Sequence, residues 1–432
     1  MHCAIIDAGV PMNRFHIWTI GCQMNKADSE TLAAELQRLG YELAQRAEDA
    51  DIIVLNSCAV RQSAEDKVLN KLANLKALKR KRPGVALALT GCLVNSNTDA
   101  LRERFAHVDF FLKPQRFDDL LAYAKGGAVE REPIPARPGS PTAFVPIIQG
   151  CNNFCSYCIV PYRRGREKSR PMDEILCGIE KLAASGVKEV TLVGQNVDSY
   201  GHDLPGKPDL AGLLRAANGI EGVLRIRFLT SHPKDMSQKL IEAIASLDKV
   251  CEHISLPAQS GDNEILRSMR RGYTIEQYRD LIHRIRRAIP DAALSNDIIV
   301  GFPGESRDQF QKTFSLLEEE RFDTVHVAAY SPRPGTIAAR KLEDSVPAEE
   351  KQDRLWQVEA LQERISSERN AALVGRTVEV LVEGRKSGKW QGRTRTDKLV
   401  FFASKADCLG QLVNVKIDHA GAWSLQGMPI VE

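Results

Sequence analysis

The sequence predicts an α/β protein with three parts: an N-terminal parallel α/β domain of the Rossmann or flavodoxin type, a partial (β/α)6 barrel of the TIM type, and a small C-terminal antiparallel β-barrel. Two observations support this prediction. Short apolar runs alternate with amphipathic helical patterns over most of the chain, which indicates parallel sheets. After residue 375, apolar residues instead recur at every second position between glycines, which is typical of a small antiparallel domain.

The first domain is predicted to span residues 14–130. Its strands are expected at residues 15–20, 51–56 and 85–90, because each is a short and largely apolar run. One helix is expected at residues 29–39, and a second helix carries an apolar face formed by Val68, Leu72 and Leu75. Strands that alternate with helices favour a parallel sheet.

A linker is predicted at residues 131–142, since the four prolines between residues 132 and 141 disfavour a regular element. The second domain is expected at residues 143–370. Its strands are predicted at residues 144–148, 189–193, 224–229, 253–256, 293–300 and 324–329. Helical segments lie between these strands, and a long helix is expected at residues 348–374. Six strand–helix units predict an incomplete barrel, whose chemistry should lie at the carboxyl ends of the strands.

The third domain is predicted at residues 371–432. Between Gly375 and Lys398 the sequence holds seven basic and three acidic residues. A small basic β-barrel is a common platform for single-stranded RNA. A module for dimerisation or packing is the alternative interpretation.

Composition narrows the class of protein. The 432 residues carry a net charge of +3, with 43% hydrophobic and 27% charged residues, as globular proteins do. We find no run of about 18 apolar residues that would indicate a membrane span, and the N-terminus lacks the pattern of a secretory signal. We therefore expect a cytoplasmic protein with no membrane partner. In a reducing compartment the ten cysteines are better candidates for metal ligands, catalytic thiols or core residues than for disulfides.

Two clusters of basic residues point to an anionic partner. The first consists of Lys76, Lys79, Arg80, Lys81 and Arg82, and the second of Arg163, Arg164, Arg166, Lys168 and Arg170. Each cluster alone is compatible with an ordinary solvated surface. Together with the basic third domain they favour a partner of the size of an RNA.

The most informative motif is CxxxCxxC, formed by Cys151, Cys155 and Cys158 directly after the first strand of the barrel. Four cysteines are the usual complement of a 4Fe-4S cluster, so three would leave one iron open for a small molecule. An open iron beside bound S-adenosylmethionine is the start of radical chemistry. A zinc knuckle is the alternative, but zinc normally takes a fourth protein ligand nearby, and no His or Cys follows before Cys177.

A second set of three cysteines lies in the first domain. Cys22, Cys58 and Cys92 each follow one of the three predicted strands. Because the carboxyl ends of parallel strands meet at one edge of a sheet, these residues should converge in space. A single cysteine at such a position would be read as a core residue. Three at equivalent positions predict a second metal cluster, again with one open iron that could carry sulfur.

These motifs resemble those of the radical S-adenosylmethionine methylthiotransferases, from about Phe15 to Val431. The resemblance lies in the segments Gly21-Cys22-Gln23-Met24-Asn25, Asn56-Ser57-Cys58-Ala59-Val60-Arg61, Thr90-Gly91-Cys92, the segment from Gln149 to Cys158, and Val160-Pro161-Tyr162-Arg163-Arg164-Gly165. The tail resembles the RNA-binding TRAM domain, which has an OB-like fold. The first eleven residues lie outside the resemblance.

The resemblance implies two 4Fe-4S clusters. One, on Cys151, Cys155 and Cys158, would cleave S-adenosylmethionine to a radical that abstracts hydrogen from C2 of an adenosine. The other, on Cys22, Cys58 and Cys92, would present a methylated sulfur, with two molecules of S-adenosylmethionine used per turnover. The family's cofactor-binding motifs fall at successive strand ends and imply contacts by Gln195, Asn196, Gln259, Ser260, Gly301 and Phe302.

Within the family, the Gly-Cys-Gln-Met-Asn segment and Pro-Tyr-x-Arg-Gly resemble the branch that modifies tRNA. The implied reaction is transfer of a methylthio group to C2 of N6-(dimethylallyl)adenosine at position 37 of tRNA, in the anticodon stem-loop. The alternatives are action on threonylcarbamoyladenosine in tRNA or on a ribosomal protein, and an RNA-binding protein with structural zinc. A flavodoxin-like or similar electron donor and a sulfur donor are implied as partners, and a monomer is expected.

Overall fold

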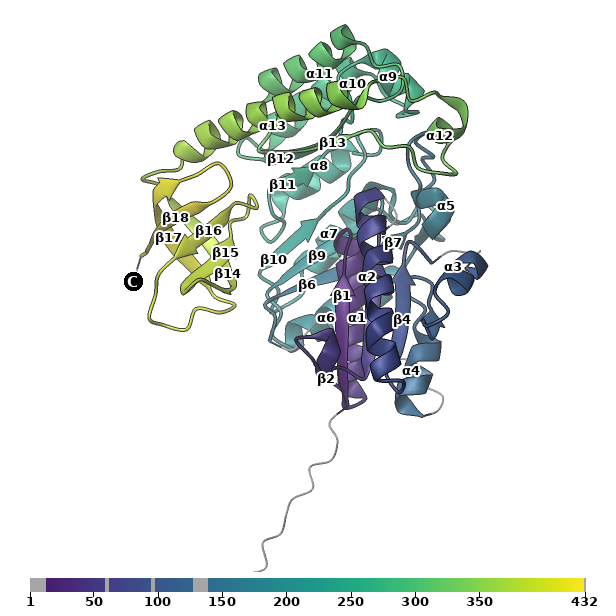
Figure 1. The fold of residues 1–432 in the computed structure, drawn as a ribbon. Coiled ribbons are helices and arrows are strands. Elements are labelled where there is room, and N and C mark those ends of the chain that lie inside the picture. Colours follow the sequence, from purple (N-terminus) through teal and green to yellow (C-terminus); the bar gives the residue numbers. More distant parts are fainter. Residues whose placement is uncertain (1–12, 59–61, 95–97, 127–138, 431–432) are drawn as a thin grey trace, which may run out of the picture. The chain divides into compact units, whose positions relative to one another are not determined.

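The computed structural model describes residues 13–58, 62–94, 98–126 and 139–430 (Figure 1). The N-terminal eleven residues, most of the predicted linker and the segment Ala59-Val60-Arg61 of one cysteine motif lie outside these ranges. The chain divides into two compact units, residues 1–137 and residues 138–432, each of which is described by itself. No helix in the described ranges is both long and apolar enough to cross a membrane.

The described strands of the first unit form one parallel sheet in the order β2-β1-β3-β4-β5. This order is the one found in flavodoxin-like folds, and it confirms the predicted parallel α/β domain. The strands are β1 (Arg14–Thr19), β2 (Glu42–Leu43), β3 (Ile52–Ser57), β4 (Ala86–Gly91) and β5 (Phe110–Phe111). The sequence did not predict β2 and β5, because two residues are too few to show a period.

Helices cover both faces of this sheet. Alternate residues of β3 and β4 point to opposite sides, so that Leu55 and Leu89 pack toward α2, whereas Val54 and Ala88 pack toward α1 and α4. The helical elements are α1 (Gln23–Arg38), η1 (Ala47–Asp49), α2 (Gln62–Lys81), α3 (Asp99–Arg104) and α4 (Asp118–Lys125). The start predicted for the first helix, residue 29, is wrong, because α1 already begins directly after Cys22, its N-cap residue.

The second unit contains the partial barrel. Its parallel strands run in the orders β6-β9-β10 and β11-β12-β13, and a parallel bridge between Ile226 and Val250 joins the two groups. The strands are β6 (Thr142–Pro146), β9 (Glu189–Val193), β10 (Arg225–Phe228), β11 (His253–Ser255), β12 (Ala293–Val300) and β13 (Thr324–Ala329). The predicted strand at residues 144–148 is wrong at its end, because Ile148 already belongs to a short hairpin of β7 (Ile148–Gln149) and β8 (Lys168–Ser169).

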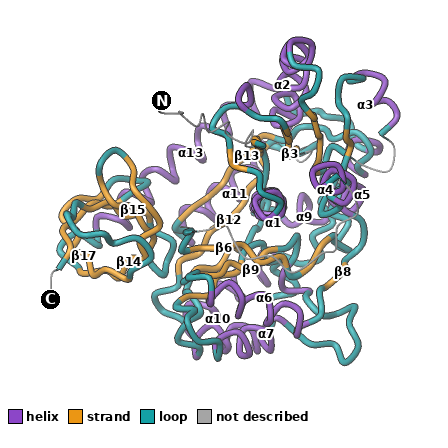
Figure 2. The backbone as a smooth tube through the Cα atoms, turned by 90° about the horizontal axis from the view of Figure 1, so that it is seen from below, coloured by secondary structure: helices purple, strands orange, loops and turns teal. Residues whose placement is uncertain are grey.

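Six helices of the barrel begin at a capping residue whose side chain accepts a backbone hydrogen bond. Thr274 and Ser306 each form a capping box, and Asp209, Ser237, Asp262 and Thr336 each accept a hydrogen bond from a backbone N–H of the first turn. Figure 2 shows α6 and α7 along the outer side of β6 and β9. The helical elements are α5 (Val160–Arg164), α6 (Met172–Ala184), η2 (Val197–Ser199), α7 (Leu210–Asn218), α8 (Gln238–Ser246), α9 (Asn263–Ser268), α10 (Ile275–Ala288), α11 (Arg307–Glu320) and α12 (Ile337–Lys341).

A long helix, α13 (Ala348–Ala371), leads into a closed barrel with the strand order β14-β15-β16-β18-β17 (Figure 1). Its core includes Val380, Trp390 and Phe402. The predicted small barrel is confirmed, although one of its strand pairs, β16 with β18, is parallel. The strands are β14 (Thr377–Lys386), β15 (Lys389–Arg393), β16 (Leu399–Phe402), β17 (Leu412–Ala420) and β18 (Leu425–Pro429).

Arginine side chains join this C-terminal barrel to the parallel strands. Arg225 of β10 is fully buried and donates to the carbonyl of Arg393 at 2.7 Å and to the Glu379 carboxylate at 2.7 Å. In the other direction, Arg395 donates to the Glu252 carboxylate at 2.6 Å. One arginine from each part therefore helps to hold the C-terminal barrel to the parallel strands.

Candidate metal centres

The CxxxCxxC loop lies between β7 and α5, at the carboxyl ends of the barrel strands. The turn into the loop requires glycine at residue 150, whose φ is +80° and where a Cβ atom would lie 2.1 Å from the carbonyl oxygen of Arg166. Cys155 is buried, whereas Cys151 and Cys158 are half-buried. Three thiols therefore line one short loop that is partly open to solvent.

Hydrogen bonds fix the shape of this loop on both sides. The backbone N–H of Asn152 donates to Glu167 at 3.0 Å, and the Ser156 N–H donates to the carbonyl of Met269 at 2.9 Å. Phe154 has a φ of +48°, and the guanidinium of Arg166 lies 4.3 Å from the centre of its ring. Arg166 of the second basic cluster thus packs against the loop, so its charge is not simply part of a solvated surface.

The electrostatics of the loop disfavour free thiolates. Burial raises the pKa of Cys151 to about 11 and the pKa of Cys158 to about 12. Both thiols therefore keep their protons at neutral pH unless a cation replaces them. Within the described ranges, no three His, Cys, Asp or Glu side chains are grouped to hold a single ion. A cubane places each thiolate on its own iron instead of on one shared ion, so this absence does not weigh against a cluster in the loop.

The other predicted cofactor residues lie at neighbouring strand ends. Gln195 follows β9, and its side-chain oxygen accepts the Gly150 N–H at 2.6 Å, directly before the cysteines. Asn196 is buried and donates to Asp235 at 2.7 Å, while its own Oδ1 has no partner among the described residues. Gln195 thus connects the cysteine loop to the carboxyl end of β9.

The residues predicted after β11 and β12 are held more deeply. Gln259 has a φ of +74° and is paired to β12, where its N–H donates to the carbonyl of Asp297 at 2.9 Å. Ser260 is fully buried near Thr313, and Phe302 is fully buried with its ring against Tyr330. Gly301 has a φ of +68°, and a Cβ atom there would lie 2.3 Å from the Lys351 side chain. The side chains of Ser260 and Phe302 thus serve packing, and contacts of this segment with a cofactor remain a prediction.

Sequence reasoning missed a group of polar residues that follow β9 and β10. Asp198 is buried, accepts from Ser231 at 2.9 Å and from the His232 N–H at 3.1 Å, and burial raises its pKa to about 7. Burial and the nearby Arg271 lower the pKa of His232 to about 2, so this imidazole is neutral, and its Nε2 has no partner among the described residues. The sequence signal was available, since Ser231 and His232 directly follow a strand of the barrel.

The second cysteine set lies at one edge of the first unit's sheet. Cys22, Cys58 and Cys92 follow β1, β3 and β4, which are neighbours in the sheet, and the Cys92 N–H donates to the carbonyl of Ser57 at 2.8 Å. A Cβ atom at Gly21 would lie 3.0 Å from the Cβ of Cys58. The sheet thus places three residues that are far apart in the sequence at the ends of neighbouring strands, and Cys22 is exposed. No three possible metal donors of the described chain are grouped around one point here, so the metal site itself remains a prediction.

Two buried asparagines support this edge, and the sequence reasoning assigned them no role. Asn25 donates to Asn56 Oδ1 at 2.7 Å and to the carbonyl of Ser57 at 2.9 Å, while Asn56 donates back to the carbonyl of Asn25 at 2.8 Å. The thiol of Cys22 donates to Asn25 Oδ1 at 3.3 Å. The available signal was their spacing, because each asparagine lies within three residues of a cysteine.

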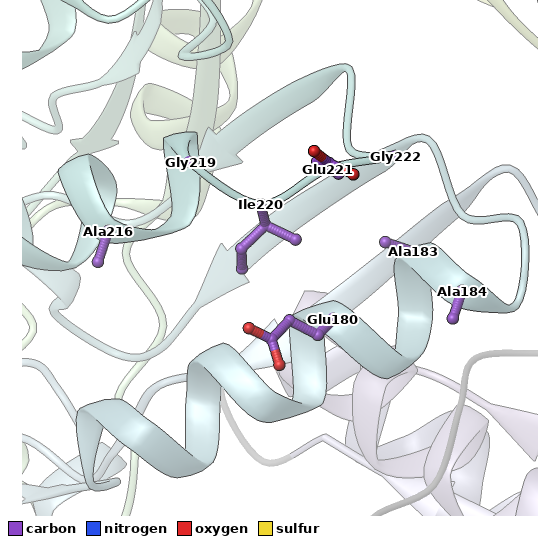
Figure 3. A pocket seen from close by; sticks show the side chains of 8 residues that line it. All are labelled: Glu180, Ala183, Ala184, Ala216, Gly219, Ile220, Glu221 and Gly222. Carbon is purple, nitrogen blue, oxygen red and sulfur yellow. The ribbon is translucent and has the colours of Figure 1, made fainter.

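A hollow of about 670 Å³ lies elsewhere in the second unit (Figure 3). It is formed where α6 and α7 end, before β9 and β10 begin, so it lies at the amino ends of the strands. Its lining residues are Glu180, Ala183, Ala184, Ala216, Gly219, Ile220, Glu221 and Gly222. The hollow is therefore separate from the cysteine loop.

Comparison with known proteins assigns all three parts of the chain. Residues 145–317 match the Radical SAM superfamily, residues 14–113 match an uncharacterized protein family (UPF0004), and residues 371–430 match the TRAM domain. A radical SAM domain implies a 4Fe-4S cluster and S-adenosylmethionine. The TRAM match agrees with the closed barrel of β14 to β18.

Curated relatives match nearly the whole chain. A protein of Dehalococcoides mccartyi named tRNA-2-methylthio-N(6)-dimethylallyladenosine synthase is 53% identical over 96% of this chain and 98% of its own length. Proteins with the same name from Roseiflexus sp. and Chloroflexus aurantiacus are 52% and 50% identical over 98% and 96% of this chain, and over 90% and 91% of their own lengths.

Solved structures agree in fold. The radical S-adenosylmethionine methyltransferase TsrM of Kitasatospora setae, solved with cobalamin and a 4Fe-4S cluster bound, aligns over 76% of this chain and 77% of its own, with a TM-score of 0.53 and 15% identity. The cobalamin-dependent radical enzyme OxsB aligns over 82% of this chain and 56% of its own, with a TM-score of 0.50 and 12% identity. At such identities the likeness concerns the fold alone.

Proposed function

The chain belongs to the family of tRNA-2-methylthio-N(6)-dimethylallyladenosine synthases, which are radical S-adenosylmethionine methylthiotransferases, and on this premise we propose that it transfers a methylthio group to C2 of N6-(dimethylallyl)adenosine at position 37 of tRNA. The observation that carries the proposal is the coexistence of two three-cysteine sites in a chain about half identical to these enzymes over nearly its full length. An aromatic C–H bond resists acid–base chemistry, so the reaction calls for a radical and for a source of sulfur.

The six cysteines divide these tasks. Cys151, Cys155 and Cys158 would hold the 4Fe-4S cluster that, with bound S-adenosylmethionine, supplies a radical able to remove hydrogen from an unactivated carbon. Cys22, Cys58 and Cys92 would hold an auxiliary 4Fe-4S cluster near the source of sulfur. The use of two S-adenosylmethionine molecules per turnover, one for the radical and one for the methyl group, belongs to this proposal.

The residues around the cysteine loop would orient the cofactor. Gln195 contacts the loop and Asn196 follows it in the chain, where its unpaired Oδ1 is an acceptor for an ammonium group. Gln259, Ser260, Gly301 and Phe302 would complete the cofactor site at the next strand ends. For Gly301 the contact would come from backbone, since the residue has no side chain.

The tRNA would contact cations that remain exposed after the internal ion pairs are formed. Arg385, Lys386 and Lys389 are exposed and flank the β14–β15 turn, where they are available for phosphates. In the first basic cluster, by contrast, Lys79 pairs with Asp109 at 2.7 Å and Arg82 pairs with Asp51 at 2.9 Å. The exposed members of that cluster, Lys76, Arg80 and Lys81, are the better candidates for binding RNA.

The remaining partners follow from the chemistry. A flavodoxin-like or similar protein would deliver the electron, and a separate donor would replace the transferred sulfur. We propose a cytoplasmic enzyme that acts as a monomer on the anticodon stem-loop.

The direct test is an anaerobic assay of the reconstituted protein with S-adenosylmethionine, sulfide, a strong one-electron reductant and tRNA that carries dimethylallyladenosine. Nucleoside mass spectrometry should show the methylthio product on this tRNA and none on the same tRNA without the prenyl group. Product on tRNA carrying threonylcarbamoyladenosine, or on a ribosomal protein, and none on the prenylated tRNA, would replace the proposed substrate.

A further inference from the structure

A buried guanidinium without a carboxylate partner lies beside the radical-generating cysteine loop. Arg271 is only 4% exposed, and its recorded partners are a carbonyl oxygen, two phenols and a thiol. No carboxylate of the described chain pairs with it. A buried charge is strongly unfavourable unless an opposite charge compensates it, so the compensating charge has to come from something that binds there.

Three other deeply buried arginines of this unit are each paired with a carboxylate. Arg354 pairs with Glu305 at 2.6 Å, and Arg227 pairs with Glu189 at 2.8 Å, with both partners of each pair nearly inaccessible to water. Arg225 pairs with Glu379 at 2.7 Å. Arg271 differs from these three in that it faces the Sγ of Cys155, a cysteine of the proposed metal site, instead of a carboxylate.

The contacts of Arg271 aim it at Cys155. One terminal nitrogen, Nη2, donates to the carbonyl of Pro257 at 2.7 Å, and Nε donates to the hydroxyl of Tyr273 at 3.0 Å. These two bonds leave Nη1 facing the Sγ of Cys155 at 3.5 Å and the hydroxyl of Tyr157 at 3.5 Å. Tyr273 is itself fixed, because its hydroxyl donates to the carbonyl of Ala258 at 2.7 Å. The guanidinium therefore has a fixed orientation before any cofactor binds.

The local backbone explains how the side chain reaches this place. The helix α9 ends in a Schellman motif, in which Arg270 takes the left-handed conformation with a φ of +58° and the N–H of Arg271 donates to the carbonyl of Leu266 at 3.0 Å. The same helix end holds the cysteine loop, since Ser156 Oγ donates to the carbonyl of Ser268 at 2.7 Å. One helix terminus thus sets both the loop and the cation.

We propose that Arg271 is a positioning residue that serves as the counter-ion of the radical-generating cluster and raises its reduction potential. Three thiolates and a 4Fe-4S core carry net negative charge, and one-electron reduction adds a further negative charge. A fixed positive charge and an N–H···S hydrogen bond at Cys155 stabilise the reduced form more than the oxidised form. Arg271 keeps its proton throughout, and the electron comes from the external one-electron donor. The inference rests on the proposed cluster at Cys151, Cys155 and Cys158.

The test is a redox titration followed by electron paramagnetic resonance. The parent is a full chain in which Cys22, Cys58 and Cys92 are replaced by alanine, so that only one cluster site remains. In this parent, Arg271→Met should lower the ratio of reduced to oxidised cluster at a fixed potential at least tenfold, which corresponds to about 59 mV for a one-electron couple. The matched control is Arg267→Met, a change of the same kind at an exposed residue of α9, which should leave the ratio unchanged.

The iron content of the parent and of each variant distinguishes failure of the proposed cluster site from failure of the proposed role of Arg271. If the parent itself binds no iron, the proposed cluster site is wrong and not merely the role of Arg271. If Arg271→Met binds about four irons and its midpoint is unchanged, the counter-ion role is wrong. If Arg271→Met loses iron, Arg271→Lys is measured next. A lysine variant that keeps the cluster, with a midpoint potential near that of the parent, supports the role of the positive charge. A lysine variant that also loses iron overturns the counter-ion role.

Discussion

The two cysteine sites are built in different ways. Cys151, Cys155 and Cys158 belong to one loop, whose shape is set by nearby hydrogen bonds and by one tight glycine turn. The N-terminal cysteines come from three separate strand ends, and only the parallel sheet brings them together. The first site therefore depends on the local sequence, whereas the second depends on the fold of a whole unit.

Their surroundings differ as well. The loop site has a buried cation, Arg271, against one of its thiols. The recorded supports of the sheet-edge site, Asn25 and Asn56, are neutral. A cation favours a site that must accept an electron, whereas neutral amides hold geometry without favouring added charge. The contrast shows how two sites with the same number of thiols can suit different chemistry, because one has a charged neighbour and the other has neutral neighbours.

The largest expected effect is the loss of reaction products, and the two cysteine sites should differ in which products are lost. Alanine at Cys151, Cys155 and Cys158 should abolish both the cleavage of S-adenosylmethionine to 5′-deoxyadenosine and the formation of methylthio product. Alanine at Cys22, Cys58 and Cys92 should abolish the methylthio product, while reductive cleavage continues. Chromatography of both products from one reaction makes the measurement. Continued methylthio transfer without the sheet-edge cysteines would contradict the assignment of sulfur transfer to that site.

The next largest effect is a loss of stability when a glycine in close contact with a neighbouring strand is replaced. Gly91 has a φ of +92°, and a Cβ atom there would lie 2.2 Å from the carbonyl oxygen of Ser57. We expect Gly91→Ala to lower the free energy of unfolding of the first unit by about 2–4 kcal/mol, measured by urea denaturation, and to remove iron from the sheet-edge site. Gly84→Ala is the control, since Gly84 lies in the same unit and nothing lies within 4 Å of the added atom. Equal stability of the two variants would show that the close strand contact at Gly91 is not required.

The asparagine support predicts a smaller loss. Replacement of Asn25 by Ala removes its bonds to Asn56 and Ser57 and leaves buried polar groups unpaired. This change should lower the free energy of unfolding by about 1–3 kcal/mol, and iron at the loop site should be unaffected. Equilibrium denaturation and iron analysis of the variant test this. Loss of iron from both sites would mean that the two are not independent.

In the second unit, which contains the cysteine loop, we expect stability to depend on pH through the buried carboxyl group of Asp198. Burial raises the pKa of Asp198 to about 7, compared with about 3.9 in an unfolded chain. Between these values the folded state binds a proton that the unfolded state releases, so stability should fall as pH rises through this window. Asp198→Asn should flatten that slope of the denaturation midpoint against pH. The same slope in both proteins would show that Asp198 titrates normally.

The smallest effect concerns RNA. Replacement of Arg385, Lys386 and Lys389 by Gln should weaken tRNA binding and reduce the salt dependence of affinity by about two to three phosphate contacts, as measured by binding titrations at several salt concentrations. Gln at Lys76, Arg80 and Lys81 provides the comparison in the other unit. An unchanged salt slope in the first variant would remove the β14–β15 turn from the RNA-binding surface.

Much of this arrangement was predictable because local patterns decided it. The strands at residues 189–193, 293–300 and 324–329 were predicted at their observed bounds, and the three N-terminal cysteines follow neighbouring strands as expected. The family and the fold of all three parts were likewise predicted from the cysteine spacing and the flanking residues, and the comparisons confirm them.

The rest depended on contacts between distant segments. Nothing local distinguishes Arg271 from the exposed Arg270 beside it, because the difference arises from the helix end that turns one side chain inward. The ion pairs of Lys79 and Arg82 with Asp109 and Asp51 could not be predicted from the sequence either. A count of positive charges therefore overstated the number of cations available to bind RNA. Such features follow from tertiary packing, which a periodicity does not encode.

The central claim, that the chain holds two independent three-cysteine clusters, is tested most directly by anaerobic iron and sulfide analysis. The samples are the reconstituted wild type, the variant with alanine at Cys151, Cys155 and Cys158, and the variant with alanine at Cys22, Cys58 and Cys92. The account predicts about eight irons per wild-type chain and about four in each variant. About four irons in the wild type, with no loss when the sheet-edge cysteines are replaced, would contradict it and leave a radical enzyme with a single cluster.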